Sequence, residues 1–359
     1  MMRENLAVLM ISNDRNIALS ESSVLERMKE YAGLVGELHI VLFSNKTHGL
    51  KNQKVGDNLW IYPTNSFNKF FRFLDAFWVG RKIDTDIITT QDPFECGFAG
   101  LLLKRVKRVP LEVQLHTDMF SPYFNGFINQ TRKFIAKIVL PRSDGVRVVT
   151  ESLKNKILEK NLNKNVCVSP IYIDKNRIEG EAKFDLHEKY GWKKILLTVS
   201  RLSPEKNIEM MLQALSIIVQ KNPDTGLVVV GSGSEEGKLK TLVQRLNLDK
   251  NVVFEGWQKD LASYYKSADI YVQTSNFEGY GLSLVEAGLT GLPIVTTPVG
   301  IANDLKKVTI ITSVDELAET LTDGNLKRGL IKEELIEKIY SKELFLKKLK
   351  ENWISLIKN

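Results

Sequence analysis

Residues 269–297 read DIYVQTSNFEGYGLSLVEAGLTGLPIVTT. Two short apolar runs, 269–274 and 292–297, are joined here by a glycine-broken turn and a segment with the spacing of a short helix. We expect that helix to begin near Gly281 and to end near Gly291, because glycine commonly closes helices. Strand, helix and strand in this order predict a βαβ unit with parallel strands buried on both faces.

The same alternation of strand and helix runs through the rest of the 359-residue chain. Periodicity lapses at 168–185, and apolar runs lie on both sides of this stretch, at 6–12, 38–44, 86–90, 111–116, 145–150, 194–200, 226–231 and 251–256. Two series of this kind predict two Rossmann-like domains. Ligands of such sheets bind beyond the carboxyl ends of the strands, so functional residues are expected just after the runs, in a cleft between the domains.

Composition narrows the class of protein. Apolar residues make up 43% of the chain and charged residues 26%, which are values of a globular protein. Two cysteines, Cys96 and Cys167, indicate neither a disulfide framework nor a metal site, and fit a reducing cytoplasm. The apolar run at the start resembles a first strand rather than a signal peptide, and no stretch has the length of a membrane span.

The excess positive charge lies in the first half of the chain. Residues 1–172 hold 24 Lys and Arg against 17 Asp and Glu, whereas 173–359 hold 26 of each. This asymmetry favours an anionic surface or acceptor as partner of the first half and a small ligand as partner of the second. A chance distribution of solvated charge is the alternative.

Two segments of the first half have the pattern of interfacial helices. Segment 67–82 places six large apolar side chains on one stripe with basic residues elsewhere, and 127–142 is a basic amphipathic segment. We expect them to contact an anionic membrane surface, at about 1 kcal/mol per basic residue. The alternative is that each stripe packs on its own sheet. The apolar stripe of the first segment comprises Phe67, Phe70, Phe71, Leu74, Phe77 and Trp78.

The sequence RLSPEKN follows the run 194–200 and carries two cations. Arg201 lies at the strand exit, and Lys206 is expected in the first turn of the next helix, where the helix dipole disfavours a cation by about 0.3–1 kcal/mol. A bound diphosphate would offset that repulsion, with both side chains as its partners. The alternative is a solvated lysine paired with Glu205 or Glu209.

Two glutamates lie close to the turn of the opening stretch. Glu286 lies among apolar helix neighbours without a basic partner on its own helix, which predicts a partly desolvated carboxylate suited to a ribose diol. Glu278, in the loop, is placed to accept hydrogen bonds from sugar hydroxyls near a phosphate, and the first-turn amides of the helix form an anion site. For either residue, an ordinary surface glutamate is the alternative.

Weaker patterns follow two other runs. Gly231 and Gly233 permit a tight turn and a close approach of the backbone to a ligand, although a strand-to-helix connection often needs glycine for itself. His116 and Asp118 lie at a strand end, where His116 is placed to contact the transferred sugar or the reacting oxygen. A structural hydrogen bond is the alternative role of this histidine.

Four segments in order resemble the retaining nucleotide-sugar glycosyltransferases of family four: DIITTQDP, SRLSPEKN, VVVGSGSEEGKL and YYKSADIYVQTSNFEGYGLSLVEAGLTGLPIVTTPVG. The resemblance covers nearly the whole chain. It implies an α/β protein of the GT-B fold, in which two Rossmann-like domains have parallel sheets that face each other across a cleft. Residues 1–172 would form the acceptor-side domain and 173–342 the nucleotide-sugar domain, with the last helix, 343–359, packing back on the first.

The resemblance also implies roles for particular residues. Glu278 would hold the donor sugar, Glu286 the ribose, and Arg201 and Lys206 the departing diphosphate, while His116 matches the histidine found at the sugar. With Glu278 and the two cations it would form the catalytic set. Further contacts with the donor are expected in the turn after Glu278, near the nucleotide base, after the run 226–231 and beside the histidine. These residues are Gly279, Tyr280, Gly281, Leu282, Trp257, Gln258, Gly231, Gly233 and Asp118.

The implied reaction is transfer of a hexose with retention of configuration, from a UDP-type or GDP-type sugar to a glycan or lipid-linked acceptor. The family uses no cofactor and no catalytic metal, in agreement with Asp84 and Asp86 forming a polar turn. The expected setting is cell-surface polysaccharide or glycolipid assembly, in the cytoplasm or peripherally at the inner face of the plasma membrane, without nucleic acid. The alternatives are an epimerase or phosphorylase of the same fold, and a non-catalytic sugar-nucleotide-binding protein.

One departure from the family pattern concerns the loop after the first run. Members commonly carry a glycine-rich loop there, facing acceptor or phosphate, whereas this chain has SNDRNIALSESS. The family's contacts at this loop therefore do not carry over to this chain.

Overall fold

The computed structural model describes residues 6–173, 176–323, 326–338 and 341–358. The chain divides into two compact units, Met1–Pro170 with Glu343–Asn359, and Ile171–Lys342. We call them the N-terminal unit and the C-terminal unit, and each is described by itself. The division falls two residues before the predicted boundary at 172.

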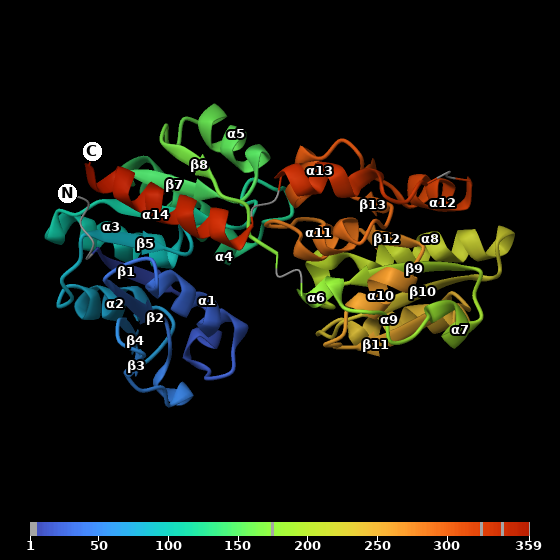
Figure 1. Ribbon diagram of the computed structural model, residues 1–359, viewed down its shortest axis with the longest axis horizontal. Helices are drawn as coiled ribbons and strands as arrows, with labels where there is room; N and C mark the ends of the chain where they lie inside the picture. Colours follow the sequence, from blue (N-terminus) through green and yellow to red (C-terminus); the bar gives the residue numbers. More distant parts are fainter. Residues whose placement is uncertain (1–5, 174–175, 324–325, 339–340, 359) are drawn as a thin grey trace. The chain divides into compact units, whose positions relative to one another are not determined.

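The N-terminal unit is built on one eight-stranded sheet (Figure 1). Its strands are β1 (Ala7–Ser12), β2 (Glu37–Leu42), β3 (Gln53–Val55), β4 (Leu59–Pro63), β5 (Ile87–Thr90), β6 (Leu111–Leu115), β7 (Gly145–Val148) and β8 (Val166–Val168). The order across the sheet is β3-β4-β2-β1-β5-β6-β7-β8, and neighbours are parallel except for the edge pair β3 and β4. Strands β3, β4 and β8 were not predicted, because they are short, lie at or near the edges of the sheet and are only partly buried.

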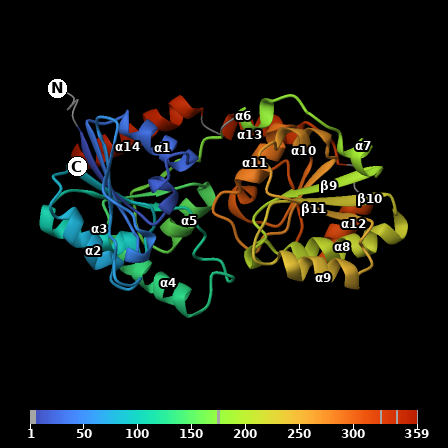
Figure 2. The same cartoon turned by 90° about the horizontal axis from the view of Figure 1, so that it is seen from below.

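Helices cover both faces of this sheet (Figure 2). Figure 2 shows α2, α3 and α4 on one face, and α1 and α14 on the other. Short 3-10 turns η1, η2 and η3 complete the unit. The bounds are α1 (Ser23–Ala32), α2 (Arg72–Gly80), α3 (Glu95–Lys107), α4 (Phe127–Val139), α5 (Glu151–Glu159), α14 (Lys342–Lys358), η1 (Arg15–Ala18), η2 (Lys46–His48) and η3 (Leu140–Arg142).

The last helix, α14, is part of the core of the N-terminal unit. Trp353 is fully buried, and its Nε1 donates to Oε2 of Glu112 in β6 at 3.0 Å. The same carboxylate accepts from the Thr89 hydroxyl at 2.6 Å and lies 3.9 Å from Nε of Arg147. A buried carboxylate needs such partners, so the helix from the far end of the chain completes a polar network inside this unit.

The apolar stripe of 67–82 does not pack on the sheet. Helix α2 begins only at Arg72, and the side chains of Phe67, Phe70, Phe71, Leu74 and Trp78 are exposed. The alternative of a buried stripe is therefore wrong for these residues. On α4, large apolar side chains are exposed as well, namely Phe127, Ile128 and Phe134. No helix in the described ranges is long and apolar enough to cross a bilayer.

The C-terminal unit repeats the architecture on a smaller sheet. Its strands are β9 (Lys194–Val199), β10 (Thr225–Val230), β11 (Val252–Gly256), β12 (Ile270–Gln273), β13 (Ile294–Thr296) and β14 (Thr309–Ile310), in the order β11-β10-β9-β12-β13-β14. All neighbours are parallel. The prediction of two α/β units with parallel sheets is confirmed; β14, only two residues long, was not predicted.

Helices again lie on both faces of this sheet. Figure 2 shows α8, α9 and α12 on one face, where they close an apolar core, and α10, α11 and α13 on the other. Helix α11 has the predicted extent, because Gly281 starts it in the left-handed region (φ 95°) and Gly291 follows it at φ 87°. The bounds are α6 (Asn176–Glu179), α7 (Leu186–Tyr190), α8 (Ile208–Lys221), α9 (Glu236–Arg245), α10 (Ala262–Ser267), α11 (Leu282–Leu289), α12 (Val314–Asp323), α13 (Leu330–Lys338), η4 (Pro204–Lys206) and η5 (Gly300–Asp304).

Candidate active site

Strand order places one potential ligand site on each sheet. In the C-terminal unit the connection from β9 leads to β10 on one side, whereas β12 leads to β13 on the other, so the loops after β9 and β12 diverge. In the N-terminal unit the same reversal falls between β1 and β5. A crevice opens at such a switch point, beyond the carboxyl ends of the strands.

In the C-terminal unit the switch point brings Lys206 and Glu278 together. The Nζ atom of Lys206, after β9, lies 2.5 Å from Oε1 of Glu278, after β12. The two side chains are only 15% and 12% exposed, and Ser275 donates its hydroxyl to the same Oε1 at 2.7 Å. The alternatives, a solvated Lys206 paired with Glu205 or Glu209 and an ordinary surface Glu278, are therefore wrong.

The predicted place of Lys206 in the first turn of a helix is wrong. Lys206 ends the 3-10 turn η4, and Asn207 adopts the left-handed conformation (φ 47°) before α8 starts at Ile208. The helix-dipole argument for a diphosphate therefore does not hold. The backbone at Lys206 is instead held by Thr274, whose hydroxyl lies 3.3 Å from the carbonyl oxygen of Lys206 and 2.9 Å from that of Asn207.

Arg201 pairs with a residue other than Lys206 or Glu278. Its guanidinium is 80% exposed, with Nη2 3.3 Å from Oε1 of Glu205, four residues on. An exposed pair of this kind contributes little stability. Convergence of Arg201 with Lys206 on a diphosphate stays a prediction.

Glu286 is desolvated, as predicted. The residue is 4% exposed in α11, and the Tyr265 hydroxyl donates to its Oε2 at 2.9 Å. An ordinary surface glutamate is therefore excluded at this position. A carboxylate has several lone pairs, so Glu286 can accept from a diol as well as from the Tyr265 hydroxyl.

The loop between Glu278 and α11 is shaped by backbone packing. Tyr280 is buried, and its carbonyl accepts from the amide of Ile301 at 2.8 Å. A side chain at Gly300 would bring its Cβ to 2.5 Å from that carbonyl oxygen. Leu282, the first residue of α11, is 37% exposed, so the first turn of the helix lies at the surface of the unit. With Gly279 and Gly281, this loop carries the predicted phosphate-binding amides.

The two glycines after β10 have a structural reason. A Cβ at Gly231 would lie 1.9 Å from the carbonyl oxygen of Ser200, and one at Gly233 would lie 2.2 Å from that of Leu202. The backbone that they approach is the neighbouring loop of the protein. A ligand is not needed to explain them, so the alternative reading accounts for both.

The predicted base contacts lie after β11. Trp257 is 74% exposed, and the Gln258 side chain donates to the carbonyl of Glu255 at 2.7 Å. The indole of Trp257 is thus exposed to solvent, whereas the Gln258 side chain is bonded to the backbone of its own turn. Their contact with a base stays a prediction.

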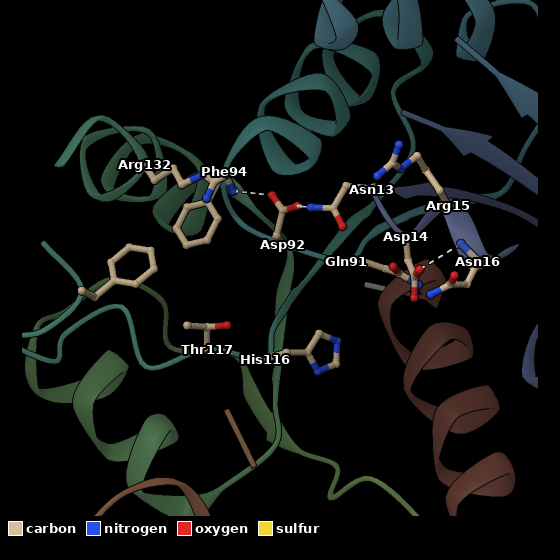
Figure 3. Close-up of a pocket in the computed structure, with 11 residues that line it drawn as sticks. Asn13, Asp14, Arg15, Asn16, Gln91, Asp92, Phe94, His116, Thr117 and Arg132 are labelled. Carbon is tan, nitrogen blue, oxygen red and sulfur yellow. Dashed lines mark hydrogen bonds between the residues drawn. The ribbon is translucent and has the colours of Figure 1, made fainter. Parts of the chain in front are cut away.

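In the N-terminal unit, the switch point holds a cavity of about 580 Å³ (Figure 3). Its walls come from the loops after β1, β5 and β6 and from α4. Figure 3 shows Phe94 and Arg132 on one side and Arg15 and Asn16 on the other. The lining residues are Asn13, Asp14, Arg15, Asn16, Gln91, Asp92, Phe94, His116, Thr117, Phe124 and Arg132.

His116 lies in this cavity as a neutral imidazole. Burial lowers its pKa to about 3, and the positive charges of Arg147 and Arg27 act in the same direction. Its Nε2 lies 2.9 Å from the amide oxygen of Gln114, which can only accept, so Nε2 carries the hydrogen and Nδ1 is an acceptor. A neutral acceptor nitrogen is suited to bind a hydroxyl group.

A buried hydrogen-bond chain holds this tautomer. Gln114 donates its amide to the Thr89 hydroxyl at 2.9 Å, and Thr89 donates to Glu112, which also accepts from Trp353. The structural hydrogen bond considered for His116 therefore exists, together with its place in the cavity.

Asp118 is not among the residues that line the cavity. Its carboxylate accepts from the amide of Phe120 at 3.0 Å and pairs with Nζ of Lys156 at 2.7 Å. Both contacts fold the loop after β6, and contact of Asp118 with the donor stays a prediction.

Sequence reasoning missed several residues of the cavity wall. Asp92 is one of them: its Oδ1 accepts from the amides of Phe94 and Cys96 at the start of α3, and its Oδ2 from Asn13 at 3.1 Å. Burial raises the pKa of this carboxyl. Arg132 pairs with Glu95 at 3.0 Å. Functional residues are expected just after the strands, and the same expectation applied after 6–12 and 86–90 would have found Asn13 and Asp92.

Within the described ranges, no three His, Cys, Asp or Glu side chains gather closely enough to hold a metal ion. Asp86, in the Asp-Thr-Asp pattern, accepts from the amide of Ala7 at 3.0 Å.

Two family models match this chain. The model of "Glycosyl transferases group 1" matches residues 180–334, and that of "Glycosyltransferase Family 4" matches residues 21–177. An uncharacterized glycosyltransferase of Methanocaldococcus jannaschii is 30% identical over 292 residues, which is 76% of this chain and 71% of that protein. The chain belongs to the group 1 glycosyltransferases.

Two characterised relatives match over a shorter region. The alpha-monoglucosyldiacylglycerol synthase of Streptococcus pneumoniae is 28% identical over 238 residues, 62% of this chain and 54% of that protein. The UDP-Gal:alpha-D-GlcNAc-diphosphoundecaprenol alpha-1,3-galactosyltransferase of Escherichia coli is 32% identical over 248 residues, 63% of this chain and 61% of that protein. The match thus spans less than two thirds of either relative.

Solved structures show the fold. Sucrose-phosphate synthase from Thermosynechococcus elongatus aligns with a TM-score of 0.78 at 20% identity, over 98% of this chain and 99% of that one. Anabaena HepE in complex with UDP and glucose aligns with a TM-score of 0.75 at 19% identity, over 98% of this chain and all of that one. The chain has the two-unit fold of GT-B glycosyltransferases.

Proposed function

We propose that this protein is a retaining glycosyltransferase that moves a hexose from a nucleotide diphosphate sugar to a glycan or lipid-linked acceptor, in cell-surface polysaccharide or glycolipid assembly. The observation that carries the proposal is the buried Lys206–Glu278 pair at the switch point of the C-terminal unit, followed by the amides that start α11. Family membership and the activities named for the two characterised relatives support it.

In this proposal the C-terminal unit binds the donor. Lys206 contacts the diphosphate with its remaining N–H donors, Arg201 swings onto it from solvent, and the amides of Tyr280 to Leu282 bind phosphate and sugar oxygens. Glu278 accepts from sugar hydroxyls and Glu286 from the ribose. The pair with Glu278 holds Lys206 in place before the donor arrives, so little reorganisation is needed in the reaction.

Bond cleavage leaves negative charge on the nucleotide diphosphate and positive charge on an oxocarbenium-like sugar. Fixed cations and amides that favour this separation lower the barrier, and no metal ion is required for it. The leaving phosphate oxygen takes the proton of the acceptor hydroxyl, on the face where the nucleotide departs. Attack from that face retains the configuration.

The N-terminal unit binds the acceptor in the cavity of Figure 3. Nδ1 of His116 is placed to accept a hydrogen bond from a sugar or acceptor hydroxyl there. The pKa of about 3 keeps this histidine neutral under all ordinary assay conditions.

A panel of ligands tests the proposal. Thermal shifts with UDP, GDP and ADP, each with and without its sugar, should identify one nucleotide that stabilises the chain. Release of that nucleotide from its sugar should then require an acceptor. Conversion of the donor without acceptor would indicate an epimerase, dependence on inorganic phosphate a phosphorylase, and stabilisation without turnover in any acceptor pool a binding protein.

We further propose that the N-terminal unit docks peripherally on the inner face of the plasma membrane. Helices α2 and α4 cover the same face of the sheet (Figure 2). Both expose aromatic side chains, and basic residues lie beside them in the sequence. Arg81 lies 4.9 Å from the Trp78 ring and Lys69 5.3 Å from the Phe70 ring. Flotation with anionic liposomes tests this placement, and absence of binding even at low salt would refute it.

A further inference from the structure

Three cations and an imidazole gather at one end of the N-terminal sheet. Arg15 lies in η1 after β1, and Lys46 and His48 lie in η2 after β2. Arg72 is the first residue of α2, on the chain after β4. Parallel strands β1, β2 and β4 are neighbours, so their carboxyl ends bring these residues to the edge of the cavity that Arg15 also lines.

Hydrogen bonds join three of them in a row. The Nη1 atom of Arg15 lies 2.6 Å from Nε2 of His48, and the amide of Asn45 lies 2.9 Å from Nδ1 of the same ring. Arg72 donates from Nε to the Asn45 side-chain oxygen at 2.8 Å. The row runs from the cavity to the start of α2.

This row is one acceptor short. A guanidinium and a backbone amide nitrogen are donors only, and they face the two ring nitrogens of His48. A neutral imidazole has one acceptor nitrogen and one N–H, so in either tautomer one donor faces another donor. An oxygen-rich anion that accepts from both Arg15 and His48, in place of their direct contact, would remove this conflict.

None of these cations forms an ion pair with a carboxylate among the described residues. Asp14 accepts from the amide of Asn16, and Glu95 pairs with Arg132. Burial lowers the pKa of Arg72 and the charge of Arg15 lowers it further, while the charge of Glu95 acts in the opposite direction. Like charges held together in this way are stabilised by a bound anion.

We propose that Arg15, His48 and Arg72, with Lys46 at the margin, bind a phosphate group of the acceptor. The inference rests on the proposed function and adds the chemical class of the acceptor. Guanidinium groups match phosphate oxygens in pairs, and an imidazole N–H can take a third oxygen. The accepting hydroxyl, attached to that phosphate through the rest of the molecule, then lies in the adjoining cavity near His116.

A second hollow adjoins the cluster. This groove of about 360 Å³ is lined by Lys46, by polar loop residues, by Asp75 of α2, and by the exposed side chains Phe67, Phe71, Leu74 and Trp78. An apolar chain attached to the phosphate would find a surface there. The phosphate could therefore belong to a soluble ester or to a lipid, and the experiment separates the two sources.

Calorimetric titration of the full chain with inorganic phosphate and with glycerol 3-phosphate tests the site. Arg15→Gln and Arg72→Gln should each weaken binding at least about tenfold, since each removes a charge-assisted hydrogen bond. Arg81→Gln, on the same helix but beside Trp78, should bind as the wild type does. Arg15 is exposed, so its variant is expected to melt as the wild type and tests the site even if Arg72→Gln folds poorly.

Two further measurements decide the interpretation. Lys206→Ala should leave phosphate affinity unchanged; loss of binding in this variant, with none in the Arg15 and Arg72 variants, would place the anion at the donor site and overturn the proposal. Vesicles of phosphatidylglycerol in phosphatidylcholine form the second arm. Weaker vesicle binding by both variants assigns the phosphate to a lipid, and weaker glycerol 3-phosphate binding alone assigns it to a soluble ester.

Failure of this inference can be told apart from failure of the proposed function. Both variants should keep the nucleotide-sugar affinity of the wild type, because their residues lie in the other unit. A chain that binds phosphate through the cluster but shows no transfer would refute the function and leave the site. Transfer with unchanged acceptor KM in both variants would refute the site and leave the function.

Discussion

The two units share a sheet design but use their switch points differently. In the C-terminal unit the charged groups satisfy one another, Lys206 with Glu278 and Glu286 with the Tyr265 hydroxyl. In the N-terminal unit three cations lack such partners among the described residues. A site whose charged groups already pair with one another favours a small ligand of fixed shape. Cations without a carboxylate partner favour an anion that supplies the missing charge.

Their surfaces differ in the same sense. The N-terminal unit contains 28 Lys and Arg against 19 Asp and Glu, whereas the C-terminal unit contains 22 against 24. Every exposed phenylalanine of the described residues lies in the N-terminal unit: Phe67, Phe70, Phe71, Phe127 and Phe134. This contrast is what the proposal expects if one unit meets a small polar donor and the other a larger, amphiphilic or anionic partner.

The largest expected effect is a loss of stability confined to the N-terminal unit. Trp353→Ala should destabilise the N-terminal unit by about 3–5 kcal/mol, because it opens a cavity and removes the Nε1–H donor of Glu112. Hydrogen exchange resolved by segment measures this, with Leu344→Ala on the exposed face of α14 as control. Equal loss of protection in both units would contradict the division.

Next in size is the loss of the buried cation of the donor site. Lys206→Ala should reduce transfer at least about 100-fold, or about 2.7 kcal/mol, since it removes a preorganised charge and leaves Glu278 without its cation. Initial rates at saturating donor and acceptor measure the effect. Lys193→Ala is the matched control, because this lysine is 85% exposed and pairs with Asp224 in the same unit. Near-normal turnover of the Lys206 variant would defeat the proposed donor site.

A comparable effect is expected at the ribose position. Glu286→Ala should also reduce transfer at least about 100-fold, and nucleotide affinity should fall with it because the diol loses its acceptor. Titration with the free nucleotide separates binding from catalysis. Glu333→Ala, at an exposed glutamate of α13, serves as control. Unchanged affinity for nucleotide would remove Glu286 from the donor site.

A smaller effect sharpens the contrast of surfaces. Phe70→Ser should lower partition onto anionic vesicles about tenfold, because burial of a phenylalanine contributes about 1.5–3 kcal/mol. Cosedimentation measures it, against Ile217→Ser, which changes an exposed apolar residue of the C-terminal unit. If both variants lose binding equally, membrane contact is not a property of the N-terminal unit.

The last prediction concerns pH. The pKa of His116 is about 3 in the folded protein and 6.5 in an unperturbed imidazole, so between these values the unfolded chain binds a proton that the folded chain does not. The free energy of unfolding should therefore fall as pH is lowered from 6.5 toward 3, and His116→Gln should remove that part of the slope. Urea titrations at several pH values measure it. His187→Gln, in the C-terminal unit, should leave this part of the slope in place.

Most of the fold could be predicted from the sequence, because central parallel strands are continuous apolar runs that need no tertiary information to be seen. Strands β3, β4, β8 and β14 escaped prediction since short or edge strands are only partly buried. The helix boundary at Lys206 was wrong because a left-handed Asn207 gives no signal in hydrophobic periodicity. Arg15, an unremarkable residue of a loop without glycine, acquires a partner only when β1 and β2 lie side by side.

By itself the sequence determined which residues follow strands, and hence that Lys206, Glu278 and His116 lie at strand ends. Hydrophobic burial is local in pattern, so strand ends can be read along the chain. Only the tertiary structure decided which strand ends meet: it joined Lys206 to Glu278, turned Asp118 toward Lys156, and left Arg15 and Arg72 without a carboxylate. Pairing of charges depends on distance in space, which strand order sets and periodicity does not record.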